Sequence, residues 1–196
     1  RVTGKEMLDV VTMVYGGLIN KDIVARLQAR GVNAAGLSGA DMDVIRSVRR
    51  PVTDGVDFGF VGDVRTVGAD RLKMLIDAGI TPVLAPLTHD GHGSMLNTNA
   101  DTIASSAATA LVDYYDVTLV FCFEKKGVLR NPDDDDSVIG RITREDYARY
   151  VADGTISGGM IPKIENALNA VDAGVKQVVI TLATEIGRHS GTVISK

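Results

Sequence analysis

The sequence predicts an α/β protein in which helices cover both faces of a mostly parallel central sheet, an open three-layer αβα sandwich. Short apolar runs with the composition of strands alternate with runs that have helical periodicity. Several strand-like runs, such as residues 117–123, are apolar nearly throughout, which is typical of parallel strands buried on both sides. A chain of 196 residues, 45% of them hydrophobic, can form a full core.

The first half of the chain is expected to begin with helical structure over residues 3–30, broken into two helices at Gly16-Gly17. A short buried strand over residues 33–38 follows and ends at Gly39. Residues 57–63 belong to a predicted β-hairpin, which departs from a purely parallel arrangement. The other elements predicted here are strands over residues 44–49 and 81–87 and an amphipathic helix over residues 69–78.

The second half continues the alternation of helices and strands. A helix rich in Ala and Ser is predicted over residues 99–111, and the apolar strand 117–123 follows it. Helices over residues 144–153 and 162–173 and strands over residues 177–182 and 191–194 complete the pattern. No internal repeat or low-complexity linker is visible, so residues 1–196 are expected to form one compact domain.

Composition and charge exclude two classes of partner. The formal net charge is −4 and there is no basic stripe, so we expect no nucleic-acid partner. No apolar stretch reaches the ~18 residues that a membrane-spanning helix needs, so we expect no membrane partner. The one cysteine, Cys122, allows no intrachain disulfide, which fits a cytoplasmic protein. Because it lies in the apolar run 117–123, we expect Cys122 to be a buried small hydrophobic residue.

A first polar segment, residues 97–101 with the sequence NTNAD, follows a predicted strand and a glycine-containing loop. Ligands in open α/β sheets bind just outside the carboxyl ends of strands. Asn97 is therefore a candidate donor to a substrate carboxylate, and Asp101, in the first turn of the next helix, is placed to orient a lysine. The alternative is an N-cap cluster, because Asn and Asp are favoured where helices begin.

A second segment, residues 158–163 with the sequence GGMIPK, places Lys163 in the first turn of a predicted helix, with Pro162 near its first position. A lysine there lies against the positive end of the helix dipole, which is unfavourable for a cation. An anionic ligand held between the ammonium group and the helix would remove this conflict. The alternative is a solvated lysine after a flexible turn.

The other polar residues, each taken alone, are weaker evidence for a binding site than these two segments. Arg1 could bind a carboxylate through two hydrogen bonds, although a terminal arginine is usually solvated. His89 and His92 have only Asp90 nearby and no cysteine, which argues against a zinc site. The acidic run over residues 133–136 is expected to be a solvated loop. We therefore predict no metal site formed by protein side chains.

In chain order, these segments resemble the acetylglutamate kinase family, a branch of the amino-acid kinase fold. The resemblance covers nearly the whole chain and is more specific than any one motif. It is carried by Arg1-Val2-Thr3, by residues 36–41 (GLSGAD), 59–64 (GFVGDV), 96–101 (LNTNAD), 127–129 (GVL) and 158–163 (GGMIPK), and by the terminal residues 191–194 (GTVI).

The resemblance implies an enzyme that uses ATP and Mg²⁺ to phosphorylate the side-chain carboxylate of an N-acylated glutamate, the second step of arginine biosynthesis. It implies that Arg1 and Asn97 hold the substrate, that Lys163 stabilises the charge on the transferring phosphoryl group, and that Asp101 orients lysines. Mg²⁺ would be bound mainly through ATP phosphates and water. The residues implied to lie beside the nucleotide are Glu124, Lys125, Lys126, Gly127, Val128, Leu129, Thr155, Ile156 and Ser157.

This chemistry suits the residues that are present. Phosphoryl transfer mainly requires positioning and cationic stabilisation from the protein. A carboxylate is already ionised and nucleophilic at pH 7, so the reaction needs no general base. The resemblance further implies that residues 1–95 belong to the acylglutamate-binding lobe and residues 96–196 to the nucleotide-binding lobe, and that the protein forms a homodimer or a larger homo-oligomer.

The chain departs from the family pattern in two places. The family's glycine-rich loop and first catalytic lysine precede the arginine that corresponds to Arg1, so the chain resembles a fragment, and we expect residues 1–196 alone to be inactive. The segment containing Lys125 and Lys126 replaces an aspartate and small or apolar residues, so its contacts with ATP are the least certain.

Two other readings stay open at this point. The chain could be another amino-acid kinase, acting on aspartate, glutamate or carbamate. It could also be a non-catalytic relative that binds ligands with the same fold. The acyl group, acetyl or a larger group such as succinyl, is not determined by these residues, and neither is feedback inhibition by arginine.

Overall fold

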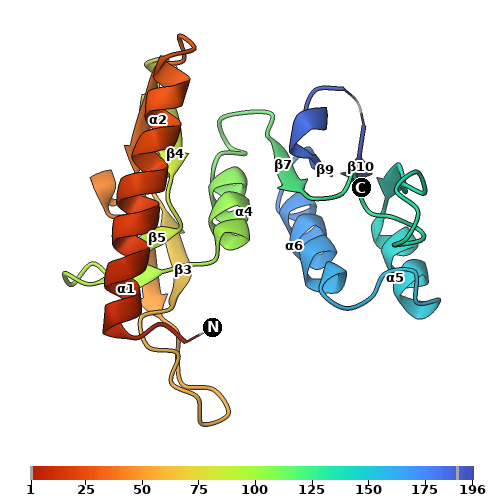
Figure 1. The fold of residues 1–196 in the computed structure, drawn as a ribbon, viewed down its shortest axis with the longest axis horizontal. Helices are drawn as coiled ribbons and strands as arrows, with labels where there is room; N and C mark the ends of the chain where they lie inside the picture. Colours follow the sequence, from red (N-terminus) through yellow and green to blue (C-terminus); the bar gives the residue numbers. More distant parts are fainter. Residues whose placement is uncertain (1, 189) are drawn as a thin grey trace. The chain divides into compact units, whose positions relative to one another are not determined.

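The computed structural model describes residues 2–188 and 190–196, which form two compact units, Arg1–Ala110 (unit 1) and Leu111–Lys196 (unit 2) (Figure 1). Helices alternate with strands in both units, which confirms the predicted α/β class. Four of the seven strand pairings in the described residues are parallel. The boundary between the two units falls after Ala110. No helix in the described part of the chain is both long and apolar enough to cross a membrane.

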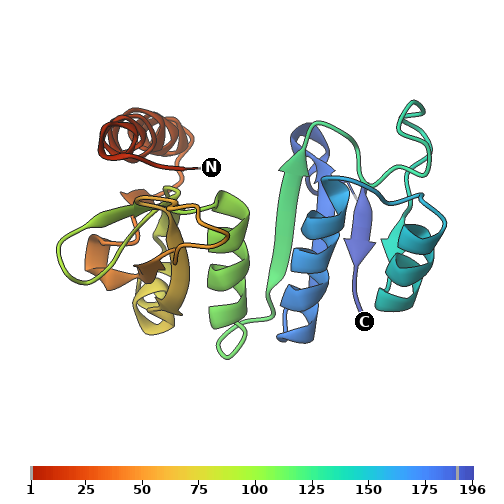
Figure 2. The same ribbon diagram turned by 90° about the horizontal axis from the view of Figure 1, so that it is seen from below.

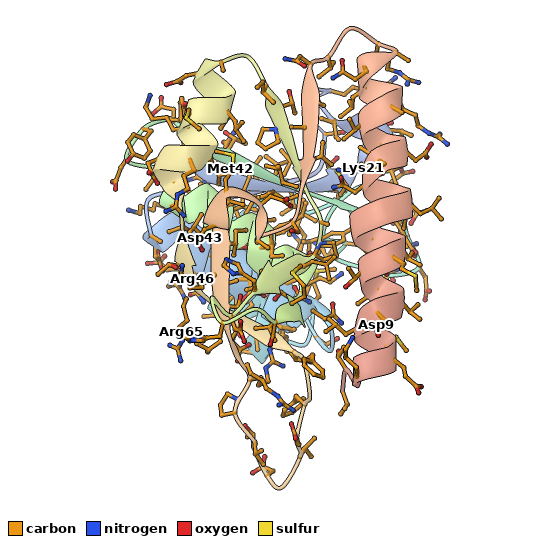
Figure 3. All side chains as sticks on the ribbon, turned by 90° about the vertical axis from the view of Figure 1, so that its left-hand side faces the viewer. Asp9, Lys21, Met42, Asp43, Arg46 and Arg65 are labelled. Carbon is orange, nitrogen blue, oxygen red and sulfur yellow. The ribbon has the colours of Figure 1, made fainter. Side chains whose placement is uncertain are left out.

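Unit 1 begins with one continuous helical rod instead of two separate helices (Figures 1 and 3). The break predicted at Gly16-Gly17 is wrong, because both glycines lie inside a π-helical stretch that links two α-helices. A side chain at Gly16 would place a Cβ atom 3.0 Å from Leu87 Cδ1, so the glycine allows close packing of the rod on a strand. The rod consists of α1 (Lys5–Val11), η1 (Thr12–Ile19) and α2 (Asn20–Gln28).

Two sheets form the remainder of unit 1 together with three short helices. β1 pairs in parallel with β4, and the other four strands follow the order β3-β2-β5-β6. The strands are β1 (Ala34–Leu37), β2 (Ile45–Arg49), β3 (Gly62–Val67), β4 (Thr81–Leu84), β5 (Leu87–His89) and β6 (Met95–Asn97). The helices are η2 (Asp41–Asp43), α3 (Ala69–Asp77) and α4 (Ala100–Ala110).

The predicted hairpin is present, but its second strand begins later than expected. β2 and β3 pair antiparallel, and the strand starts at Gly62 instead of residue 57. Residues before Gly62 make isolated contacts with the start of the chain, where Gly59 bridges Thr3. The strand predicted over residues 81–87 is likewise divided at Pro86 into β4 and β5, since proline has no N–H group for a sheet ladder.

Unit 2 contains one four-stranded sheet in the order β7-β9-β10-β8, with α6 packed against β9 and β10 (Figure 2). Ile164, Ala167, Leu168 and Val171 are buried at helical spacing along α6, so one face of this helix forms the core of the unit. The elements are β7 (Thr118–Phe123), β8 (Arg141–Ile142), α5 (Arg144–Ala152), α6 (Met160–Asp172), β9 (Gln177–Leu182), η3 (Ala183–Glu185) and β10 (Thr192–Ile194).

Cys122 is exposed, so the prediction that it is buried is wrong. β7 is the edge strand of its sheet, and its side chains alternate between two faces. Leu119 and Phe121 are buried on one face, whereas Val120 and Cys122 project from the other and are exposed. The apolar run therefore indicated a strand correctly, but it did not indicate which of its faces is covered.

Candidate functional site

Asn97 lies at the end of β6 and is fixed by contacts with two distant segments. Its N–H group donates to Phe60 O (2.8 Å), and its side-chain Nδ2 donates to Thr3 Oγ1 (3.1 Å). Thr98, the next residue, is buried, and its Oγ1 lies 2.8 Å from Thr88 Oγ1. We call Thr3, Phe60, Asn97 and Thr98 the Asn97 cluster. Neutral hydrogen bonds hold this cluster in place, and its amide is half-buried.

The Asn97 cluster brings together two segments that the sequence predicted to act on one substrate. Thr3 belongs to the Arg1-Val2-Thr3 segment, and its hydroxyl group contacts Asn97 directly although 94 residues separate them. Arg1 itself lies outside the described residues. Thr3 was not singled out in the sequence, because no local pattern distinguishes it from any other threonine that precedes a helix.

Asn99, rather than Asn97 or Asp101, caps α4. Asn99 Oδ1 accepts a hydrogen bond from the N–H group of Thr102 (3.0 Å), the contact expected of an N-cap side chain. The capping alternative therefore accounts for one residue of the NTNAD segment. Asp101 is half-buried in the first turn, and no residue in the described part of the chain makes a hydrogen bond or an ion pair with its carboxylate.

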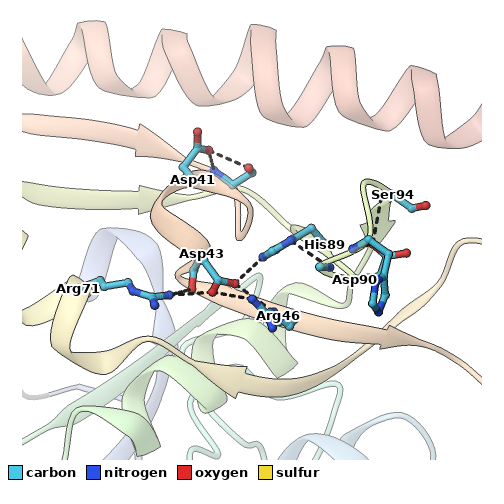
Figure 4. A network of polar contacts seen from close by, with 10 residues as sticks. Asp41, Asp43, Arg46, Arg71, His89, Asp90 and Ser94 are labelled. Carbon is cyan, nitrogen blue, oxygen red and sulfur yellow. Dashed lines mark hydrogen bonds and ion pairs between the residues drawn. The ribbon is translucent and has the colours of Figure 1, made fainter.

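His89 belongs to a polar network that centres on Asp43, shown in Figure 4. Asp43 Oδ1 lies 2.8 Å from His89 Nε2, and Asp43 Oδ2 lies 2.8 Å from Arg46 Nη2 and 3.0 Å from Arg71 Nη1. Partial burial raises the pKa of Asp43, but hydrogen bonds from Arg71, Arg46 and His89 outweigh it and hold the pKa below its usual value. The network connects η2, β2, β5 and α3, so His89 has a structural partner.

Lys163 is half-buried in the first turn of α6, as predicted, and Pro162 is the third residue of the helix. Its Nζ lies 3.8 Å from the centre of the Phe123 ring, at the end of β7. Among the described residues, no carboxylate lies within ion-pair distance of this ammonium group. A half-buried cation with only an aromatic ring beside it, at the positive end of a helix, favours binding of an anion.

The turn before α6 is open in front of Lys163. Gly158 adopts a φ of +55°, and a Cβ atom on Gly158 or Gly159 would have no atom within 4 Å. Backbone N–H groups at such a turn can approach a phosphate closely because no side chain intervenes. We call Ser157, Gly158, Gly159 and Lys163 the Lys163 turn.

The predicted nucleotide segment, residues 124–129, divides into an exposed and a buried part. Glu124, Lys125 and Lys126 are exposed. Gly127, by contrast, is buried, and a Cβ atom there would lie 2.8 Å from Thr192 Oγ1. Val128 is buried as well, and its N–H group donates to Thr192 Oγ1 (2.8 Å).

The side chain of Leu129 is buried too, and Leu129 bridges Val138. Gly127, Val128 and Leu129 therefore belong to the packing of unit 2, and the exposed residues before them are the ones accessible to a ligand.

Both lysines of this segment already have partners. Lys125 Nζ lies 2.7 Å from Asp135 Oδ1, and Lys126 Nζ lies 2.9 Å from Asp136 Oδ1. The hydrogen bonds that the two ammonium groups donate to these carboxylates raise the pKa of both lysines. The acidic run, predicted to be a solvated loop, is exposed but also pairs with this segment ten residues away, which no local pattern in the sequence indicates.

The second predicted nucleotide segment precedes the Lys163 turn. Thr155 is half-buried, and its N–H group donates to Asp153 Oδ1 (2.9 Å). Ile156 is buried, and its N–H group donates to Tyr150 O, whereas Ser157 is exposed. Thr155 and Ser157 can therefore present hydroxyl groups to a ligand, and Ile156 anchors the segment in the core.

The donor set suits Mg²⁺ bound to a nucleotide better than a metal held by protein alone. No group of three or more His, Cys, Asp or Glu side chains in the described part of the chain could hold an ion. In unit 2, Asp135 and Asp136 are paired with lysines. Phosphate oxygens and water are the usual ligands of such a Mg²⁺ ion.

Comparison with known proteins places this geometry in a family. The model of the Amino acid kinase family matches residues 1–182. The acetylglutamate kinases of Phocaeicola vulgatus and Bacteroides thetaiotaomicron are 68% and 66% identical to the chain, over all of it and 76% of their own length. N-acetylglutamate synthase from Neisseria gonorrhoeae, solved with coenzyme A and N-acetyl-glutamate, shares the fold, with a TM-score of 0.85 at 22% identity over the whole chain and 45% of its own length. The chain therefore belongs to the amino acid kinase family, in the branch of the acetylglutamate kinases.

Proposed function

We propose that this protein transfers the γ-phosphoryl group of ATP to the side-chain carboxylate of N-acetyl-L-glutamate and forms the acyl phosphate, the second step of arginine biosynthesis. The main support for this reaction is the 68% sequence identity with an acetylglutamate kinase over the entire chain. Such a level of identity, spread over both units, favours this enzyme over a kinase for aspartate, glutamate or carbamate and over a non-catalytic relative.

Lys163 is proposed to stabilise the phosphoryl group during transfer. Its ammonium group has no carboxylate partner in the described residues, and it lies beside a turn without side chains at the start of α6. Charge that develops on the phosphoryl oxygens would meet this cation and the backbone N–H groups of the helix start. Replacement of such a preorganised donor typically lowers kcat by a factor of about 10² to 10³.

Asn97 and Arg1 are proposed to hold the N-acylglutamate. After its bond to Thr3, the Asn97 amide retains one N–H group and its Oδ1, which suits an amide or carboxylate on the substrate. Asp101 is proposed to orient lysine side chains, a role that fits a half-buried carboxylate without another partner in the described residues. Unit 1 would then supply the substrate side of the reaction.

Unit 2 is proposed to bind ATP through the exposed part of its two nucleotide segments. Glu124, Lys125 and Lys126 are accessible, as are Ser157 and the hydroxyl group of half-buried Thr155. Asp135 and Asp136, which pair with Lys125 and Lys126, compete with phosphates for these ammonium groups. The remaining members, Gly127, Val128, Leu129 and Ile156, would shape the site by packing. Mg²⁺ would neutralise phosphate charge when it is bound with the nucleotide.

The helical rod is proposed to join copies of the chain into a homodimer or a larger homo-oligomer. The rod exposes several large apolar side chains, among them Met13 (65% exposed) and Leu18 (71% exposed). A row of such residues on an otherwise polar surface commonly marks an interface. Sedimentation of wild type and of Leu18→Asp tests this: a shift from oligomer to monomer in the variant supports it, and a monomeric wild type contradicts it.

A coupled assay of ADP release from the full-length gene product tests the reaction. It compares N-acetyl- with N-succinyl-glutamate in the presence of ATP and Mg²⁺, for wild type and Lys163→Ala. Lys176→Ala is the matched control, because Lys176 is an exposed lysine of the same unit whose ammonium group pairs with Asp116.

We expect turnover with the acetyl substrate and its loss in Lys163→Ala but not in Lys176→Ala. Turnover with only the succinyl substrate would show that the substrate is N-succinyl-glutamate instead of N-acetylglutamate. Absence of turnover with either substrate, by folded protein that binds ATP, contradicts the proposed function.

We propose that the reaction takes place in the cytoplasm, where ATP is available.

A further inference from the structure

We propose that Thr3 is a positioning residue, whose hydroxyl group holds the Asn97 amide in the orientation that receives the N-acylglutamate. The inference rests on the proposed function of Asn97 and adds a residue that acts through it. Thr3 does not touch the substrate in this account. Its role is to fix one N–H group of the amide, so that the other N–H group and Oδ1 face the ligand in one defined orientation.

The backbone of Thr3 is held from both sides by the loop that precedes β3. The N–H group of Thr3 donates to Phe58 O (3.0 Å), and the N–H group of Phe60 donates to Thr3 O (2.8 Å). Gly59 lies between them with a φ of +68°, and a Cβ atom on it would lie 2.2 Å from Thr3 O. These contacts use main-chain atoms only, so they persist whatever side chain residue 3 carries.

The side chain of Thr3 is buried against Asn97 and is 1% exposed. Water therefore cannot readily replace its hydroxyl group as the partner of Asn97 Nδ2. The main chain of Phe60 links Thr3 to Asn97. Its N–H group donates to Thr3 O, and its carbonyl accepts from the N–H group of Asn97 (2.8 Å). Main chain and side chain of Asn97 are thus both fixed by one small set of contacts.

A hydroxyl group that only stabilised the fold would have a different signature from one that orients the amide. Loss of a structural hydrogen bond lowers the free energy of unfolding and leaves the kinetic constants of the folded enzyme unchanged. Loss of an orienting hydrogen bond lets the amide rotate, and substrate binding must then restore its order. The predicted signature is a higher KM for the N-acylglutamate at an unchanged KM for ATP.

The test compares Thr3→Val, which removes the hydroxyl group at nearly constant volume, with Thr3→Ser, which keeps it. We expect Thr3→Val to raise the KM for N-acetylglutamate about tenfold, the equivalent of one hydrogen bond of about 1.4 kcal/mol. Thr3→Ser should restore KM to within about twofold of wild type. Thr181→Val is the matched control, since Thr181 is also 1% exposed but its Oγ1 has no hydrogen-bond partner among the residues that the structure describes.

A double variant tests whether Thr3 acts through Asn97. Once Asn97→Ala has removed the amide, the further change Thr3→Val should leave the KM for N-acetylglutamate unaltered, because nothing remains to be oriented. An unchanged KM in Thr3→Val, additive effects in the double variant, or an equal rise in the KM for ATP would each overturn the inference while the proposed function stands. All these variants are made in the full-length gene product, and absence of activity in its wild type would overturn both the inference and the proposed function.

Discussion

The Asn97 cluster and the Lys163 turn position their key side chains in opposite ways. Asn97 is held by a neutral, largely buried set of hydrogen bonds from segments far away in the sequence. The ammonium group of Lys163 lies over the ring of Phe123, beside an open glycine turn. Lys125 and Lys126 in the same unit form exposed ion pairs. A fixed cluster suits the selection of one small substrate by shape, whereas open charges suit a phosphoryl group that must arrive, react and leave.

The largest expected difference concerns Gly59 and Gly158, two of the glycines that have a positive φ. Gly59→Ala would place Cβ 2.2 Å from Thr3 O, whereas Gly158→Ala would meet no atom within 4 Å. We expect Gly158→Ala to lower the free energy of unfolding by about 1 kcal/mol, the cost of the backbone conformation alone. Gly59→Ala should cost at least about 2 kcal/mol more, because main-chain atoms must move. Denaturant titration of both variants measures this, and equal losses would contradict the difference in packing.

A smaller effect, on the KM for ATP, is expected from the exposed ion pairs of Lys125 and Lys126. Asp135→Asn with Asp136→Asn removes the carboxylates that pair with Lys125 and Lys126, so both ammonium groups become available to phosphate. We expect the KM for ATP to fall about two- to threefold, in keeping with the small free energies of exposed ion pairs. The KM for N-acetylglutamate should not change. Asp116→Asn, which removes an exposed carboxylate paired with Lys176, is the control. A higher KM for ATP would mean that the ion pairs assist nucleotide binding.

The smallest effect concerns pH and the network around Asp43. Contacts with Arg71, Arg46 and His89 hold the pKa of Asp43 below its value in the unfolded chain. The stabilisation is therefore fully present above a pH of about 4, the ordinary pKa of aspartate, and is lost as pH falls through the lower folded value. Asp43→Asn should unfold more easily than wild type at neutral pH, and the difference should close on acidification. A difference independent of pH in thermal melting would exclude this charge effect.

Local patterns predicted the elements well where packing follows from the sequence near the residue. The glycine and proline signals before Lys163 located the start of α6, and the apolar spacing located its buried face. The same reasoning failed for Cys122, because the apolar run does not tell which face of the strand is covered. It also failed at Gly16-Gly17, where close packing on Leu87 accounts for Gly16 without a helix break.

The candidate site was predictable mainly through the family pattern. That pattern implied roles for Asn97 and Lys163, which stay predictions, while spacing alone left a cap or a solvated lysine as alternatives. The contacts that distinguish the site were not visible in the sequence. Thr3 meets Asn97 across 94 residues, and Lys125 meets Asp135 across a loop, and such pairings depend on the tertiary fold.

We propose that the Asn97 cluster and the Lys163 turn act on different parts of the reaction. Steady-state kinetics of Asn97→Ala beside Lys163→Ala in the full-length gene product test this division of roles most directly. Asn97→Ala should raise the KM for N-acetylglutamate by about ten- to a hundredfold, with the KM for ATP unchanged. Lys163→Ala should lower kcat by a factor of about 10² or more and leave the KM for N-acetylglutamate near that of wild type. If both variants altered the same constant, or if Asn97→Ala raised the KM for ATP, the division of roles would be contradicted.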